Sequence, residues 1–62
     1  MPLLQGLRGV RERLGVSVQE LAAKSGVSAD SISNFEELRS MASPRTARRL
    51  AEALGVREED LK

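Results

Sequence analysis

The sequence contains no cysteine, histidine, tyrosine or tryptophan among its 62 residues. Without cysteine it has no disulfide and no thiolate metal ligand, and without histidine it lacks the commonest general base. Its many serines have no histidine to activate them. The acidic groups at 36–37 and 58–60 suit solvated helix faces better than an acid–base pair. We therefore expect no enzymatic activity, no bound metal and no cofactor.

Long hydrophobic runs are missing as well. No apolar stretch approaches the length of a membrane span, and the apolar start at residues 1–4 is too short for a signal peptide. A chain this short fits one domain, which we expect to cover 1–62. These features predict a cytoplasmic protein without a membrane partner and without a small-molecule substrate.

The net charge is only +1, but the charges are unevenly distributed along the chain. Residues 25–37 carry three acidic side chains and no basic one, whereas residues 38–49 carry four arginines and no acidic one. A basic block of this kind is the pattern expected of a surface that meets phosphates.

Four apolar residues recur at helical spacing near the start of the chain: Leu3, Leu7, Val10 and Leu14. This stripe predicts a first helix with one buried face, although Gly6 and Gly9 inside it are unfavourable for a helix. Gly15 is placed to end that helix in a left-handed conformation.

Two short helices are predicted next, in the stretch 18–37. Ser17 and Glu20 have the spacing of a capping box, Gly26 ends the helix, and Ser28 can cap the following one. A connection as short as residues 25–27 forces the two helices to cross sharply. Ala22 would allow the close approach, and the angle would be filled by Leu21, Val27, Ile32 and Phe35.

A fourth helix should begin at Ser43 and Pro44, because proline is favoured at the first helical position. Its buried stripe is predicted to be Ala47, Leu50, Ala51 and Leu54. Gly55 ends it, and a last helical turn lies between Val56 and Leu61. The expected fold is all-α, a compact bundle of four to five helices.

The order of these motifs resembles the helix-turn-helix domains of Cro and the lambdoid phage repressors, also called the xenobiotic-response-element type. The matching segments are Leu-Gly-Val-Ser at 14–17, Glu-Leu-Ala at 20–22, Ser-Gly-Val-Ser at 25–28, Ile32, Glu36, Ser-Pro at 43–44 and Leu-Ala-Glu-Ala-Leu-Gly-Val at 50–56. Together they span about 7–61 and place the helix-turn-helix at 18–37.

The resemblance implies that the third helix, at about 29–38, enters the major groove of double-stranded DNA. Its base-reading positions fall on Ala29, Asp30, Ser33 and Asn34. Asn34 is suited to a bidentate pair with adenine. Asp30 either favours the N-terminus of its helix, or it selects a base or repels wrong sites.

The resemblance also implies a set of phosphate contacts: Ser17, Gln19, Ser28, Arg39, Ser40 and Arg45. For the two arginines the alternative is plain solvated charge. Arg48 and Arg49 are expected to face solvent or a partner. The position where the family commonly has a phosphate-binding Gln is Val18 here.

Two further expectations follow from the same resemblance, and a third follows from the pattern of apolar residues. Arg11 is expected to pair internally with Glu36. Leu38 and Ala42 replace a glycine and a proline of the family pattern, which predicts that helix three continues into the loop at 38–42. Because Leu38 and Met41 have no place in the buried stripes, they form a candidate dimer patch, with Val56 as the other candidate.

The function implied is that of a sequence-specific transcriptional regulator, a repressor, acting as a homodimer on two half-sites. The alternative is a protein–protein interaction module of the same fold, antitoxin-like or adaptor-like, with weak or no DNA readout. The acidic balance over 25–37 and the short side chains at the reading positions favour this alternative.

Overall fold

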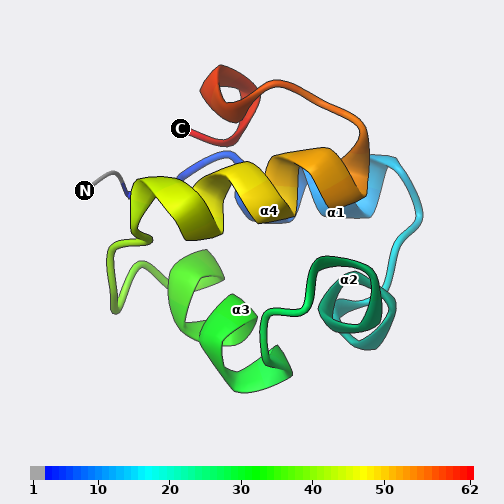
Figure 1. The fold of residues 1–62 in the computed structure, drawn as a ribbon, viewed down its shortest axis with the longest axis horizontal. Helices are drawn as coiled ribbons and strands as arrows, with labels where there is room; N and C mark the ends of the chain where they lie inside the picture. The colour runs from blue at the N-terminus through cyan, green and yellow to red at the C-terminus, as the bar shows by residue number, and fades with distance from the viewer. Residues whose placement is uncertain (1–2) are drawn as a thin grey trace.

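Four α-helices and a final 3₁₀ turn make up the computed structural model, which describes residues 3–62 (Figure 1). The elements are α1 (Leu7–Arg13), α2 (Val18–Ser25), α3 (Ala29–Glu36), α4 (Pro44–Leu54) and the 3₁₀ turn η1 (Glu58–Leu61). No strand occurs in this part of the chain, so the all-α prediction is confirmed. Met1 and Pro2, which the expected domain includes, lie outside the described residues.

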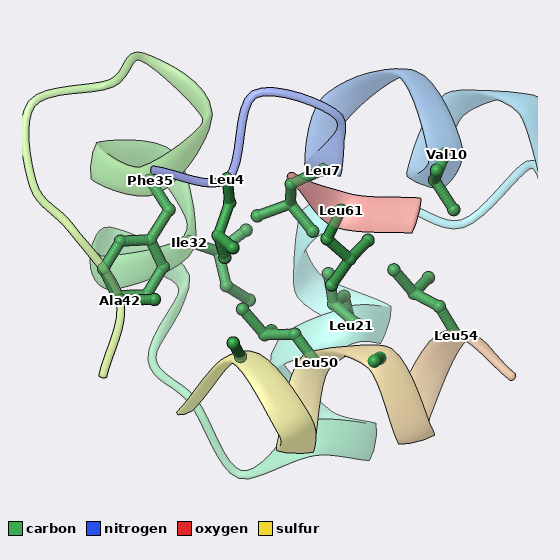
Figure 2. Packing of buried hydrophobic residues seen from close by; sticks show 12 residues of the cluster. Leu4, Leu7, Val10, Leu21, Ile32, Phe35, Ala42, Leu50, Leu54 and Leu61 are labelled. Atoms are coloured by element: carbon green, nitrogen blue, oxygen red, sulfur yellow. The ribbon is translucent and has the colours of Figure 1, made fainter. Parts of the chain in front are cut away.

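A single apolar cluster joins all the elements. It is built from Leu4, Leu7, Val10, Leu21, Ile32, Phe35, Ala42, Ala47, Leu50, Ala51, Leu54 and Leu61. Figure 2 shows Leu7, Leu50 and Leu61 pointing toward one another, from α1, α4 and η1. The predicted stripe of α4 is therefore buried as expected, and η1 covers the core from the side opposite α3 (Figure 1).

The helix boundaries follow the capping residues and glycines. Ser17, Ser28 and Ser43 each accept a hydrogen bond from a backbone N–H three residues on, which confirms three predicted helix starts. The predicted ends near Gly15, Gly26 and Gly55 are also confirmed. Local hydrogen bonding therefore sets most of the element boundaries.

The prediction for the start of the first helix is wrong. The helix begins at Leu7, Gly6 is its N-cap, Leu4 rather than Leu3 is buried, and Leu14 is 47 % exposed. The cause is contact with η1, because the Gly6 N–H donates to the Leu61 carbonyl over 2.8 Å. The Leu7 N–H donates to the Leu4 carbonyl over 3.2 Å, so a turn at residues 5–6 precedes the helix and Leu4 enters the core.

The prediction that helix three continues into the loop is also wrong. The helix ends at Glu36, and the backbone turns at Leu38, whose φ is +60°. Two hydrogen bonds close the end, from Leu38 N–H to the Phe35 carbonyl (3.2 Å) and from Arg39 N–H to the Asn34 carbonyl (2.9 Å). Ala42 is fully buried, so the loop returns to the core instead of extending the helix.

Candidate nucleic-acid interface

The joint between α2 and α3 is fixed by a short set of hydrogen bonds. The Ser25 hydroxyl donates to the Leu21 carbonyl (2.6 Å) and accepts from Val27 N–H (3.1 Å), so this buried hydroxyl makes hydrogen bonds both as a donor and as an acceptor. Gly26 has a φ of +75°, and its N–H donates to the Ala22 carbonyl over 3.0 Å. The left-handed backbone that glycine permits makes the sharp turn between the helices.

Apolar side chains then fix the angle between the two helices. Leu21, Ile32 and Phe35 are buried, and Ala22 and Val27 pack against them while staying partly exposed. These are the residues that the sequence predicted to fill the crossing. The helix-turn-helix at 18–37 is therefore packed on the core, and the opposite face of α3 lies outside.

The N-terminus of α2 carries the predicted capping box. Glu20 N–H donates to the Ser17 hydroxyl (3.0 Å), and Ser17 N–H donates to the Glu20 carboxylate (3.1 Å). Hydrogen bonds from the backbone and hydroxyl of Ser17 lower the pKa of Glu20 below its usual range. Gln19 lies between them on the chain and is exposed.

The N-terminus of α3 is capped by Ser28. Its hydroxyl accepts from Ser31 N–H (3.2 Å) and donates to the Ser31 hydroxyl (2.9 Å). Asp30 is exposed in the first turn, where a carboxylate favours the positive end of the helix dipole. An exposed carboxylate at this position also repels phosphates.

The four predicted reading positions share the outward side of α3. Asp30 is exposed, and Ala29, Ser33 and Asn34 are half-exposed, whereas Ile32 and Phe35 face the core. Within residues 3–62, no side-chain hydrogen bond engages Asp30, Ser33 or Asn34. Their polar groups are therefore free to meet the edges of bases.

Arg11 and Glu36 form a partly buried ion pair between α1 and α3. Arg11 donates to both carboxylate oxygens of Glu36, with Nε at 2.6 Å and Nη2 at 3.1 Å, and through Nη1 to the Val16 carbonyl at 2.8 Å. The two side chains are 12 % and 7 % exposed. The hydrogen bond to Glu36 raises the pKa of Arg11. The pair therefore ties α3 to α1.

The two arginines expected to hold phosphates differ in their surroundings. Arg39 pairs with Glu37 at 3.0 Å, and both side chains are exposed. Arg45 is exposed in the first turn of α4 and has no ion pair within the described chain. Ser40 lies half-buried in the loop between these arginines. Arg45 can therefore bind an anion at once, whereas Arg39 must first leave Glu37.

Two more arginines of α4, Arg48 and Arg49, also differ from each other in their surroundings. Arg48 pairs with Glu58 of η1 at 3.3 Å, away from the helix-turn-helix. Arg49 reaches the turn between α2 and α3, because a Cβ built on Gly26 would lie 3.8 Å from Arg49 Nη1. Sequence reasoning missed this placement, since only the packing of α4 on α2 determines it.

The exposed surface has few other features. Leu14, Leu38 and Met41 are the large apolar side chains exposed on the described surface, whereas Val56 is partly buried against the core. Across residues 3–62 there is no pocket and no cluster of side chains that could hold a metal ion. No described helix is long and apolar enough to cross a membrane.

Comparison with known proteins gives one match. A family model described as helix-turn-helix matches residues 7–61, which is most of the chain. Neither the search of curated proteins nor the search of solved structures found a match.

Proposed function

The chain belongs to the Cro/C1-type helix-turn-helix family typical of regulators of the xenobiotic-response-element type, and we propose that it represses transcription by binding specific sites on double-stranded DNA. The observation that carries the proposal is the outward face of α3. It is rigidly supported by the Arg11–Glu36 pair, and its polar groups have no internal partners in the described structure.

In this proposal the first turns of α3 lie in the major groove. Asn34 pairs with adenine through its amide, since that side chain can bond both exposed polar groups of the base. Ala29 and Ser33 have short side chains and allow close approach to the groove. Asp30 either accepts from a cytosine amino group or only supports the helix dipole.

The phosphate contacts position α3 and supply most of the affinity. Arg45 contributes more than Arg39, because it has no competing carboxylate in the described structure. Arg39 contributes less, because the 3.0 Å pair with Glu37 has to break first. Polar groups at the starts of α2 and α3 and in the loop complete the set, namely Ser17, Gln19, Ser28 and Ser40.

We further propose that the protein acts as a homodimer. A reading helix of eight residues contacts few base pairs, so one copy gives little specificity. Two copies related by a two-fold axis would occupy two half-sites about one helical turn apart.

Binding to a labelled duplex of random sequence, measured by fluorescence anisotropy at several salt concentrations, tests the proposal. Affinity should fall steeply as salt rises, because phosphate contacts release counterions. Arg45→Ala should weaken binding to all duplexes equally and reduce the salt slope by roughly one. Arg39→Ala should have a smaller effect.

Arg57→Ala is the matched control, because Arg57 is exposed and directly precedes η1, and η1 lies on the side of the molecule opposite α3 (Figure 1). It should leave both the affinity and the salt slope unchanged. A chain that binds no duplex even at low salt would contradict the proposal and favour the interaction-module alternative.

A further inference from the structure

Three helices of this chain end with the same pair of backbone hydrogen bonds, but only α3 does so without glycine. One residue at the end of each of α1, α3 and α4 is left-handed, with φ of +70° at Gly15, +60° at Leu38 and +70° at Gly55. In each case the following residue donates to the carbonyl five positions back. Within residues 3–62, Leu38 is the one non-glycine residue with a positive φ.

Leucine is a costly choice at that position. The left-handed conformation brings Cβ close to the following carbonyl, a strain that glycine avoids. Burial of the side chain could compensate, but Leu38 is 46 % exposed. Glycine at position 38 would therefore give a more stable fold. We take the exposed leucine side chain as a sign of a function other than stability.

The neighbours of Leu38 define a small surface, the loop patch, made of Glu37, Leu38, Arg39 and Met41. Met41 is 49 % exposed in the same loop, so two large apolar side chains are available within four residues. Glu37 and Arg39 lie on either side of Leu38 in the chain, and their opposite charges pair at 3.0 Å. The loop patch is thus apolar, electrically balanced and bordered by one charge of each sign.

We propose that the loop patch is the surface through which two copies of this chain associate, with Leu38 as its apolar anchor. A two-fold interface brings a surface against itself, so the surface must be self-complementary. The loop patch meets that condition in charge, because Glu37 of one copy can pair with Arg39 of the other in place of the 3.0 Å pair within each copy. A strongly acidic or basic partner would be attracted by one of these groups and repelled by the other.

This proposal deepens the proposed function, because it rests on two copies sharing one DNA site, but its test needs no DNA. The loop patch is small, so association in solution is expected to be weak. Two adjacent half-sites would raise the effective concentration of one copy near the other.

The first test combines sedimentation equilibrium up to about 1 mM with urea unfolding of the same variants. Leu38→Gly should weaken association about tenfold or more, as expected for an interface anchor, while raising the urea midpoint because the strain is gone. Leu14→Ala is the matched control, because Leu14 is equally exposed at 47 % but lies at the end of α1. It should leave association unchanged.

The second test uses charge reversal. Glu37→Arg gives a patch with two positive charges and Arg39→Glu gives one with two negative charges, so each variant alone should associate more weakly than the parent. An equimolar mixture of the two should associate at least as well as the parent, because opposite charges then face each other.

Several results would overturn the proposal. The first is a parent chain that stays monomeric at about 1 mM. The second is a Leu38→Gly variant that associates as well as the parent or is less stable than the parent. The third is a mixture of the two charge-reversal variants that associates no better than either variant alone. A monomeric parent whose affinity for one isolated half-site falls on Leu38→Gly would instead assign the patch to contact with DNA. Failure of association with intact salt-dependent DNA binding would overturn the homodimer but leave the proposed binding to DNA standing.

Discussion

Replacing Arg11 with methionine, which keeps a long apolar stem, removes three hydrogen bonds at once. The variant loses the two bonds to Glu36 and the one to the Val16 carbonyl. It leaves a carboxylate that is only 7 % exposed without its partner. Changing the other partner, Glu36→Gln, leaves Arg11 its hydrogen bond to the Val16 carbonyl and its ion pair with Glu12, whose carboxylate lies 3.9 Å away. Arg11→Met should therefore be the more damaging of the two.

The expected size follows from the burial of the pair. Leaving one charge of a buried ion pair uncompensated costs about 3–5 kcal/mol, and the lower figure suits this pair because it is partly buried. A domain of 62 residues has a total stability of about 3–9 kcal/mol, so Arg11→Met removes a large part of it. Glu36→Gln should cost about 1–2 kcal/mol, since a neutral amide still accepts a hydrogen bond from Arg11. The double variant should lose less than the sum of the two.

Urea unfolding followed by far-ultraviolet circular dichroism measures this cycle, because the chain has no tryptophan or tyrosine to report by fluorescence. With a slope of about 1 kcal/mol per molar urea for a domain of this size, Arg11→Met should lower the midpoint by about 3 M. A stabilising co-solvent keeps the weaker variants folded at the start of the titration. Additive losses in the cycle would refute the reasoning, because they would show that the two side chains do not interact.

Two other features lead to stability predictions. Gly6→Ala should cost about 1–3 kcal/mol, because its Cβ would lie 2.6 Å from the Asp60 carbonyl oxygen, whereas Gly9→Ala, with nothing within 4 Å, should gain about 0.5–1 kcal/mol. Equal urea midpoints for these two variants would contradict the packing of η1 on Gly6. The pKa of Glu20 is lowered in the folded chain, so the ionised carboxylate stabilises the fold. This stabilisation is fully present at pH values above the usual pKa of glutamate, and it is lost as the pH falls through the pKa of the folded chain. Glu20→Gln should therefore be less stable than the parent at neutral pH, and the difference should vanish in acid; a difference independent of pH would contradict the capping role of its charge.

Local signals in the sequence were sufficient for most of the fold. Ser17, Ser28 and Ser43 satisfy backbone donors within three residues, so their positions indicate helix starts without knowledge of the tertiary structure. The first helix was placed too early because its start depends on Leu61, far away in the sequence. Periodicity alone could not distinguish Leu3 from Leu4 as the buried residue.

The surface of α3 and its surroundings was less predictable. The partnership of Arg11 with Glu36 came from the family resemblance, since nothing in their spacing of 25 residues indicates contact. The loop at 37–43 was misjudged because leucine normally avoids the left-handed conformation that Leu38 adopts. The pairing of Arg39 with Glu37 and the reach of Arg49 toward Gly26 depend on side-chain placement, which the sequence pattern does not encode.

The most direct test of the central claim, that the outward face of α3 reads DNA sequence, is a selection from randomised duplexes on three proteins. The parent should enrich a motif containing adenine, and Asn34→Ala should lose that base at a cost of about 1–3 kcal/mol on the preferred site and almost nothing on random duplex. Asp30→Asn should bind all DNA more tightly. Its sequence preference at one base pair should weaken only if Asp30 accepts a hydrogen bond from a cytosine amino group. An Asn34→Ala protein that selects the parent's motif with the parent's affinity would contradict the account.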